Sequence, residues 1–350
     1  MRRLTLFCVA AAGAVVSVAL LTGYVSLRPG LDSSDPIIRG FLETGKKEGW
    51  SWLRKEERIW SLGPVQLYDY GAGKWQDLFR IPGESGAYNY LFSYCPAKRL
   101  LAFYDVWWDA GDGGLSKFGG FSGKLCVVEL DTGITDVVRN QTGAPSSFSP
   151  DGRTLAFYDS SSYKELLAYD LTTRTVRKLA DVRYWTGMDE GLLEGIGRSS
   201  MRITTSPVFS PDSRCIYYVG PDSAAYKLDL ESGEKETLFP AHLVVGIRGD
   251  AVLFVRNHRL FVAEKQESEW VTRCLHPPTK NLWDPPHIYE SCFATPGGEF
   301  VICDEWFGPH KSDIGWRIFE VATAKSVLIR DHALFGQWSG FCAPAGVKGD

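Results

Sequence analysis

The side chains best suited to chemistry or ligand binding are carboxylates, histidines and tryptophans that gather in a few segments. They are Asp105, Trp107, Trp108, Trp185, Trp283, His287, Asp304, Glu305, Trp306 and His310. Paired carboxylates with a histidine can catalyse acid/base cleavage of a polysaccharide. Aromatic rings beside carboxylates can instead stack on a sugar ring or anchor a protein partner. A structural role is also open, in which the tryptophans fold back over strands of their own domain.

Motifs that would favour catalysis are absent. The chain has no Gly-x-Ser-x-Gly nucleophile turn and no His-Glu-x-x-His metal motif. The segment Gly40–Lys46 has the glycine and lysine spacing of a phosphate loop, but Lys47 stands where Ser or Thr would bind magnesium. The segment Asp109–Gly113 lacks the ligand count and the terminal acid of a calcium loop. We therefore expect no catalytic residue, no metal and no cofactor, and a binding role is favoured over an enzymatic one.

Two cysteines flank a turn signal symmetrically. Cys292 and Cys303 lie on either side of Pro296–Gly298, so a tight hairpin would place them opposite each other. They could then form a disulfide or remain as two buried thiols, and both interpretations are open. None of the 8 cysteines is in a Cys-x-x-Cys pair or at a zinc-like spacing.

The N-terminus indicates a membrane. After Arg3 no charged residue occurs before Arg28, and this run, as a helix, would span about 36 Å, more than the ~30 Å hydrocarbon core. We predict a transmembrane helix over residues 1–27, with the arginines before it cytoplasmic and the rest of the chain extracytoplasmic. The alternative is a signal peptide cleaved near Ser17–Ala19, which would make the protein secreted.

The composition indicates a globular protein rich in strands and turns. The chain has 350 residues, of which 44% are hydrophobic and 23% charged, and it contains 36 Gly and 18 Pro. Its net charge of −4 argues against a generic surface for nucleic acid, so no nucleic-acid partner is expected.

A hairpin with an acidic residue at a fixed position recurs along the chain. The acid follows a short apolar strand and precedes a turn position by four residues. The acids are Asp69, Glu129, Asp170, Asp229, Glu264 and Glu320, and the turn positions are Gly73, Gly133, Arg174, Gly233, Ser268 and Ala324. Five of these six turn residues are small or flexible, which suits a hairpin that needs a permissive backbone.

A second repeated piece precedes most of these hairpins. Phe148–Phe157 and Phe209–Tyr218 each contain Ser-Pro-Asp followed by Gly or Ser, which predicts strand, tight turn, strand. Joining the two pieces gives four-stranded antiparallel units at intervals of 35 to 60 residues. Units of this size arranged radially form a β-propeller.

These repeats resemble the TolB-type six-bladed β-propeller, with its WD-like Phe-Ser-Pro-Asp-Gly core and following Tyr-x-x-Asp-Leu. The resemblance covers residues 56–342 and is strongest at Ser147–Leu179 and Val208–Leu238. It implies an all-β fold, a six-bladed propeller of four-stranded antiparallel blades. No α/β domain of the kind that precedes the propeller in TolB fits between Leu27 and Glu56, so TolB's own role is not carried over.

Ring closure follows from a missing strand. The first hairpin has one candidate strand before it, Arg58–Leu62, so we expect the C-terminal segment Ala333–Trp338 to supply the other. Residues 28–55 would be a tether and 343–350 a tail. The Pro-Asp-Gly turns share one face of such a ring, and the longer loops with the candidate residues share the other.

The sequence therefore predicts a membrane-tethered, extracytoplasmic propeller. Its loop-rich aromatic face would bind a protein or envelope component without catalysis. The alternative is a carbohydrate-binding or carbohydrate-cleaving protein that uses the carboxylates and histidines of the same face.

Overall fold

The computed structural model describes residues 34–58, 61–69, 74–80, 93–109, 120–140, 145–159, 164–182, 206–257, 259–275, 287–307, 312–329 and 340–342. These residues form one helix, α2 (Pro36–Glu48), and antiparallel sheets of four strands each, named A to F here.

The sheets are given with their strands in the order in which they pair. Sheet A contains β24 (Gly340–Cys342), β1 (Ser51–Arg58), β2 (Ser61–Asp69) and β3 (Lys74–Phe79). Sheet B contains β4 (Ser93–Cys95), β5 (Leu100–Asp109), β6 (Gly120–Glu129) and β7 (Thr135–Asn140). Sheet C contains β8 (Ser146–Phe148), β9 (Thr154–Tyr158), β10 (Glu165–Asp170) and β11 (Thr175–Asp181). Sheet D contains β12 (Val208–Phe209), β13 (Cys215–Val219), β14 (Ala224–Asp229) and β15 (Lys235–Pro240). Sheet E contains β16 (Leu243–Arg248), β17 (Ala251–Arg256), β18 (Arg259–Gln266) and β19 (Glu269–Cys274). Sheet F contains β20 (His287–Ala294), β21 (Phe300–Phe307), β22 (Ser312–Glu320) and β23 (Lys325–Ile329).

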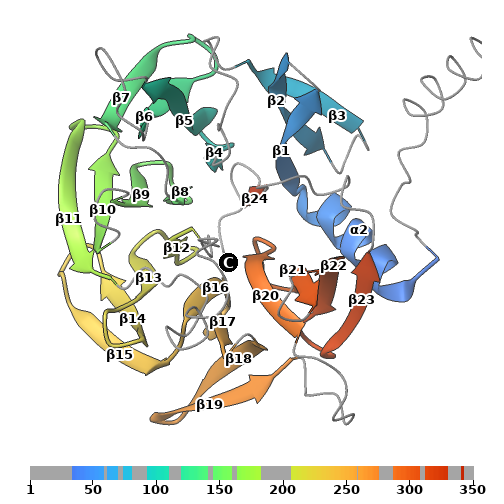
Figure 1. Cartoon of the computed structure of the whole chain (residues 1–350). Helices are drawn as coiled ribbons and strands as arrows, with labels where there is room; N and C mark the ends of the chain where they lie inside the picture. Colours follow the sequence, from blue (N-terminus) through green and yellow to red (C-terminus); the bar gives the residue numbers. More distant parts are fainter. Residues whose placement is uncertain are drawn as a thin grey trace, which may run out of the picture.

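The sheets stand radially around a centre, as Figure 1 shows. The first strand of each sheet is innermost, and it contacts the innermost strands of the sheets on either side, from β4 through β8, β12, β16 and β20 to β24. The all-β propeller of four-stranded antiparallel sheets is therefore confirmed.

Strand alternation explains how neighbouring sheets hold together. On β5, Leu101 and Phe103 pack in a core shared with sheet A, whereas Ala102 and Tyr104 pack in a core shared with sheet C. Successive side chains of a strand point to opposite faces, so a strand buried on both faces reads as a continuous apolar run. Each pair of adjacent sheets shares such a core.

The repeated Ser-Pro-Asp turns form by local hydrogen bonds. The Ser149 hydroxyl donates to the Asp151 carboxylate at 2.6 Å, and this carboxylate also accepts the Arg153 N–H at 3.0 Å. Ser210 and Asp212 repeat the arrangement in sheet D. The Asp151 N–H donates to the Ser213 hydroxyl at 3.0 Å, so the turn of sheet C is linked to the turn of sheet D.

The tether predicted over residues 28–55 is wrong where the structure describes it, because α2 and most of β1 lie there. Asp35 caps the helix by accepting the N–H groups of Ile37 and Ile38, and Pro36 occupies the first turn. Ile38 and Phe41 are buried with Phe300 of sheet F. The helix thus fills the joint between sheets F and A (Figure 1).

The first strand also differs from the expectation. Arg58 ends β1 and Ser61 begins β2, so Arg58–Leu62 spans a strand connection rather than forming one strand. The sequence did not predict a strand at Ser51–Arg58 because five of these eight residues are charged, which is not typical of a strand that pairs on both edges.

A C-terminal strand pairs with the first strand of the ring, but its residues differ from those predicted. Gly340–Cys342 pairs with Ser51–Leu53 at the inner edge of sheet A. The residues proposed for this role, Ala333–Trp338, lie outside the described part of the chain. The helix predicted over residues 1–27 and the tail 343–350 also lie outside it. From Ser34 onward, no helix in the described ranges is long and apolar enough to span a membrane.

Candidate ligand-binding face

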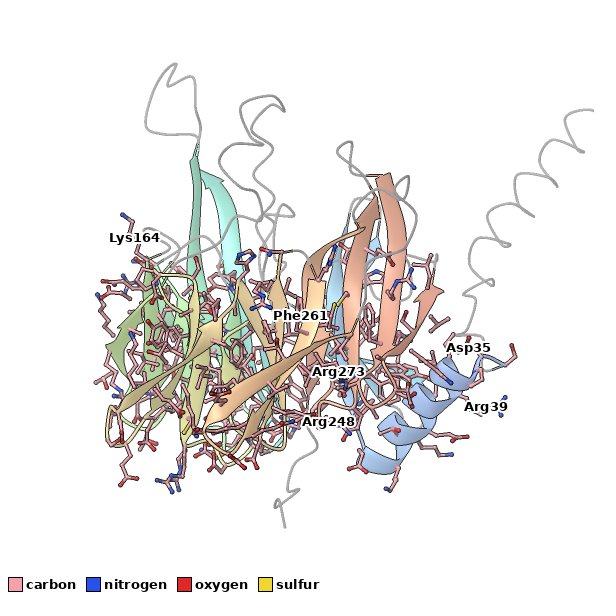
Figure 2. All side chains as sticks on the ribbon, turned by 90° about the horizontal axis from the view of Figure 1, so that it is seen from below. Asp35, Arg39, Lys164, Arg248, Phe261 and Arg273 are labelled. Atoms are coloured by element: carbon pink, nitrogen blue, oxygen red, sulfur yellow. The ribbon has the colours of Figure 1, made fainter. Side chains whose placement is uncertain are left out.

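One face of the ring carries the strand connections between the second and third strands of each sheet, and we call it the loop face. Lys164, which precedes β10, marks it in Figure 2, whereas Arg248, the last residue of β16, marks the opposite side. Strands of sheets B and F rise above the others on the loop face (Figure 2). β5 and β6 have 10 residues each, and β21 and β22 have 8 and 9, as do β1 and β2 of sheet A, whereas β9 and β13 have 5.

Sheet D shows how short the same connection can be. Gly220 and Ala224 close a tight turn, in which the Gly220 N–H donates to the Ala224 carbonyl at 2.9 Å. The Tyr226 hydroxyl donates to the Asp222 carboxylate at 2.6 Å, and this hydrogen bond lowers the pKa of Asp222. The Lys235 ammonium lies 3.8 Å from the centre of the Tyr226 ring. The loop face is therefore asymmetric, with long hairpins on sheets F, A and B and a closed turn on sheet D.

The candidate residues of the first segment lie along β5. Asp105 is partly buried and pairs in register with Lys124, while Trp107 and Trp108 pair with Ser122 and Phe121. These three residues therefore belong to the part of the hairpin that rises toward the loop face.

The candidate residues of the second segment lie at the same end of sheet F. Asp304, Glu305 and Trp306 follow one another on β21, and His287 is the first residue of β20. In the register of these two strands, His287 pairs with Phe307 and Trp306 pairs with Ile288, so His287 and Trp306 are one position apart. Trp185, Trp283 and His310 lie outside the described residues.

The two groups do not share one sheet interface, because sheet A separates sheet B from sheet F in the ring. Asp105 lies on the same side of β5 as Leu101 and Phe103, which pack toward sheet A. Asp304 lies on the same side of β21 as Ile302, which packs toward α2 and sheet A. The two carboxylates thus flank sheet A from opposite sides.

Glu305 has a structural partner that the sequence did not reveal. Its side chain is 0% exposed, and the carboxylate accepts hydrogen bonds from Arg317 Nε at 2.5 Å and Nη2 at 3.1 Å. Arg317 also donates to the Ser326 hydroxyl at 3.2 Å. Such a two-point ion pair occupies the carboxylate, so the role of Glu305 as an exposed ligand-binding group is corrected to that of a buried partner of Arg317.

The sequence did not identify Asp159, an acidic residue at the loop face. Asp159, which is 3% exposed, pairs with Arg139 of sheet B at 3.3 Å and so links sheets B and C. A signal was present, because Leu-Ala-Phe-Tyr-Asp occurs at both Leu101–Asp105 and Leu155–Asp159. The equivalent position of sheet F is Glu305, so two of these three acids are held by arginines.

No metal centre is indicated in the described ranges, where no group of three or more His, Cys, Asp or Glu side chains could hold an ion. The arrangement that remains is a raised, asymmetric face over sheets F, A and B, with aromatic residues on its two hairpins.

Comparisons with known proteins show the fold. A scan against protein-family models gives no match, and neither does a search of curated proteins. Among solved structures, TolB from Acinetobacter baumannii is similar with a TM-score of 0.52 and 15% identity, covering 85% of this chain and 67% of that chain. The Cps50 (Swd1) β-propeller domain of Myceliophteria thermophila has a TM-score of 0.47 and 12% identity over 79% of this chain and 81% of that chain. At these identities the likeness to TolB supports a β-propeller and nothing about activity.

Proposed function

We propose that this protein is a non-catalytic binding module whose ligand face lies over sheets F, A and B. The observation that carries the proposal is the asymmetry of the loop face, where only certain sheets extend their hairpins beyond the ring. Long connections on one side of a rigid scaffold are the usual place for ligand binding, since the scaffold fixes their bases.

The state of the acids favours binding over catalysis. A general acid or base must reach the substrate with a free carboxyl group. The carboxylate of Glu305 is buried against Arg317, and that of Asp159 is buried against Arg139. This removes Glu305 from the acid/base set that a carbohydrate-cleaving enzyme would use.

The partner that we propose is a protein or another component of the cell envelope. Trp107, Trp108 and Trp306 lie on the raised hairpins, and large aromatic side chains are the most frequent anchors of protein interfaces. The apolar run before Arg28 would tether the ring to the membrane with this face outside the cytoplasm. Protease digestion of spheroplasts tests this placement: loss of the propeller without lysis of the spheroplasts supports it, and protection until lysis contradicts it.

We also propose that the propeller has six blades and is of TolB type. Sheets A to F, each in contact with the next through its innermost strand, support a six-bladed ring of TolB type. The likeness to TolB from Acinetobacter baumannii is consistent with it.

The test is a triple substitution of Trp107, Trp108 and Trp306 to Ala in the full chain. We expect crosslinked capture of the native partner from membranes to be lost. The melting temperature should stay within about 2 °C, because the proposal puts these residues on a surface and surface substitutions change stability little. A matched control replaces three exposed apolar residues of outer strands and their turns, Ile134, Val137 and Val271, with Ala. Undiminished capture by the tryptophan variant, or equal loss in the control, would overturn the assignment of the face.

A glycan array with the purified ectodomain separates protein binding from the carbohydrate alternative. Retention of a glycan that the triple variant fails to retain would favour a lectin, and release of shortened glycan would favour an enzyme. Absence of both leaves the protein-binding proposal standing.

A further inference from the structure

Cys292 and Cys303 lie directly opposite each other in the β20–β21 hairpin. The Thr295 N–H donates to the Phe300 carbonyl next to the turn. Hydrogen-bonded pairs alternate with non-hydrogen-bonded pairs along an antiparallel ladder, so Phe293–Ile302 is a hydrogen-bonded pair and Cys292–Cys303 is not. Residues in such a pair have Cα atoms about 4.5 Å apart, within the ~4.4–6.8 Å range of disulfides.

The sulfur atoms of Cys292 and Cys303 are in contact. The Sγ atoms are 2.7 Å apart, closer than two unbonded sulfur atoms normally pack. Both side chains belong to the core between sheets E and F, and they are 2% and 0% exposed. Formation of a bond therefore needs a small side-chain adjustment and no movement of the strands.

We propose that Cys292 and Cys303 are joined by a disulfide in the mature protein. The proposal rests on the extracytoplasmic placement given above, because disulfides persist in oxidising compartments. The bond would link the innermost strand β20 to β21. It would lie between the turn that joins the two strands and their other end, which carries His287 and Trp306.

The chemistry is thiol–disulfide exchange with an oxidised dithiol donor. The thiolate of one cysteine attacks a donor sulfur, which forms a mixed disulfide and releases the first donor thiolate. The second cysteine, after losing its proton, attacks the bonded cysteine sulfur, so the Sγ–Sγ bond forms and the second donor thiolate leaves. Two electrons pass to the donor, which ends as a dithiol after taking up two protons.

Burial sets the time at which this exchange can occur. Burial and the neighbouring Cys292 thiol raise the pKa of the Cys303 thiol well above its ordinary value, which suppresses the reactive thiolate in the folded protein. The exchange therefore takes place while the hairpin is still open to the donor. Once the core between sheets E and F has packed, the same burial protects the bond from reductants.

The first measurement uses the full-length protein from its native membranes, quenched in acid and alkylated without reduction. Mass spectrometry of the digest should show the Cys292 and Cys303 peptides linked, with two hydrogens fewer than the free thiols. Alkylation of both thiols without prior reduction would overturn the proposal.

A second measurement separates the bond from the compartment. The purified chain is unfolded, reduced and refolded with oxidised and reduced glutathione, and the linked peptide should form. A failure to form it here overturns the bond alone and leaves the proposed binding face intact. Linkage here but free thiols in native membranes overturns both the bond in the mature protein and the extracytoplasmic placement.

Stability provides a check that needs no peptide mapping. If the bond exists, Cys292→Ala, Cys303→Ala and the double variant each lose the same cross-link, so each should lower the melting temperature by a similar amount, about 5 °C or more. Two independent thiols would instead give losses that add in the double variant. Cys215→Ala, at a buried cysteine of sheet D, is the control that should leave the linked peptide in place.

Discussion

Gly246 provides a test of how sheets E and F meet at the centre of the ring. It lies on β16, and a Cβ atom built on it would lie 2.2 Å from the Cβ of Ala294 on β20. Its φ is not in the left-handed region, so the requirement for glycine comes from space and not from backbone strain. The variant Gly246→Ala should therefore disrupt the contact between two innermost strands.

The magnitude follows from the distance. Carbon atoms in contact lie about 3.5–4.0 Å apart, so the strands would have to separate by more than 1 Å. Both strands belong to a closed ring, in which opening one joint displaces the others, and the interior is close-packed. Overpacking of this kind costs about 1–3 kcal/mol. We expect urea unfolding to show a loss of about 2–3 kcal/mol, which for a slope near ~3 kcal/mol/M lowers the midpoint by about 0.7–1 M.

A reciprocal substitution makes this prediction specific. In Gly246→Ala with Ala294→Gly, the methyl group moves from one strand to the other and the clash disappears. The double variant should unfold within about 1 kcal/mol of the wild type, which gives a coupling of at least about 1 kcal/mol. Gly40→Ala in α2 is the control, because a Cβ there meets only Phe300 Cζ, at 3.7 Å, and should stabilise the helix by about 0.5–1 kcal/mol. Unchanged stability of Gly246→Ala, or additive losses in the double variant, would refute the packing of β16 against β20.

Two further predictions concern the helix and the turns. Phe41→Ala should destabilise the protein by about 3–5 kcal/mol in urea unfolding, since this buried ring packs 5.6 Å from Phe300, whereas Glu43→Ala on the exposed side should change little. Hydrogen bonds from the Ser210 hydroxyl and the Arg214 N–H lower the pKa of Asp212, so the folded state holds its proton less tightly than the unfolded chain. This stability is present above the unfolded carboxyl pKa of about 3.9 and is lost as the pH falls through the folded pKa, so Asp212→Asn should flatten acid unfolding below about pH 4. A steeper acid transition in that variant would contradict the assignment.

The repeated hairpins could be predicted because their chemistry is local. Asp170 accepts the N–H groups of Thr172 and Thr173 at 2.8 Å, and Asp229 repeats the pattern, which explains the acid before these two turns. Glu129 and Glu320 instead accept hydrogen bonds from the hydroxyls of Thr132 and Thr323. The position four residues later has positive φ in Gly133, Arg174, Gly233 and Ala324. The backbone conformation is thus what repeats, and the residue type follows it only in part.

One hairpin departs from this rule. After Glu264, the left-handed residue is Glu267 and not Ser268, so the turn comes one residue earlier than the pattern predicts. The strands on either side, β18 and β19, pair up to Gln266 and Glu269, which leaves a two-residue turn. Spacing alone does not distinguish a two-residue turn from a longer one.

The helix and the ion pairs could not be predicted because their causes are distant in the sequence. Asp35 and Pro36 begin the helix by local contacts, but the helix persists because Phe41 and Trp50 pack against Phe300 of the last sheet. The sequence does not show that Glu305 pairs with Arg317, because Arg317 lies on the next strand. Only the register of β21 and β22 brings the two side chains together.

The contacts that the sequence did not predict lie near the joint at which β24 pairs with β1 and closes the ring, which we call the seam. β24 contributes only three residue pairs to β1, so this edge of sheet A is weakly held by the ladder alone. The wedge of α2 between sheets F and A, the Glu305–Arg317 pair and the opposed cysteines of the β20–β21 hairpin all stiffen the sheet next to that seam. The raised hairpins belong to sheets B and F, on either side of sheet A. A partner that contacts both would bridge the seam, and because it binds the closed ring only, binding and ring closure would stabilise each other.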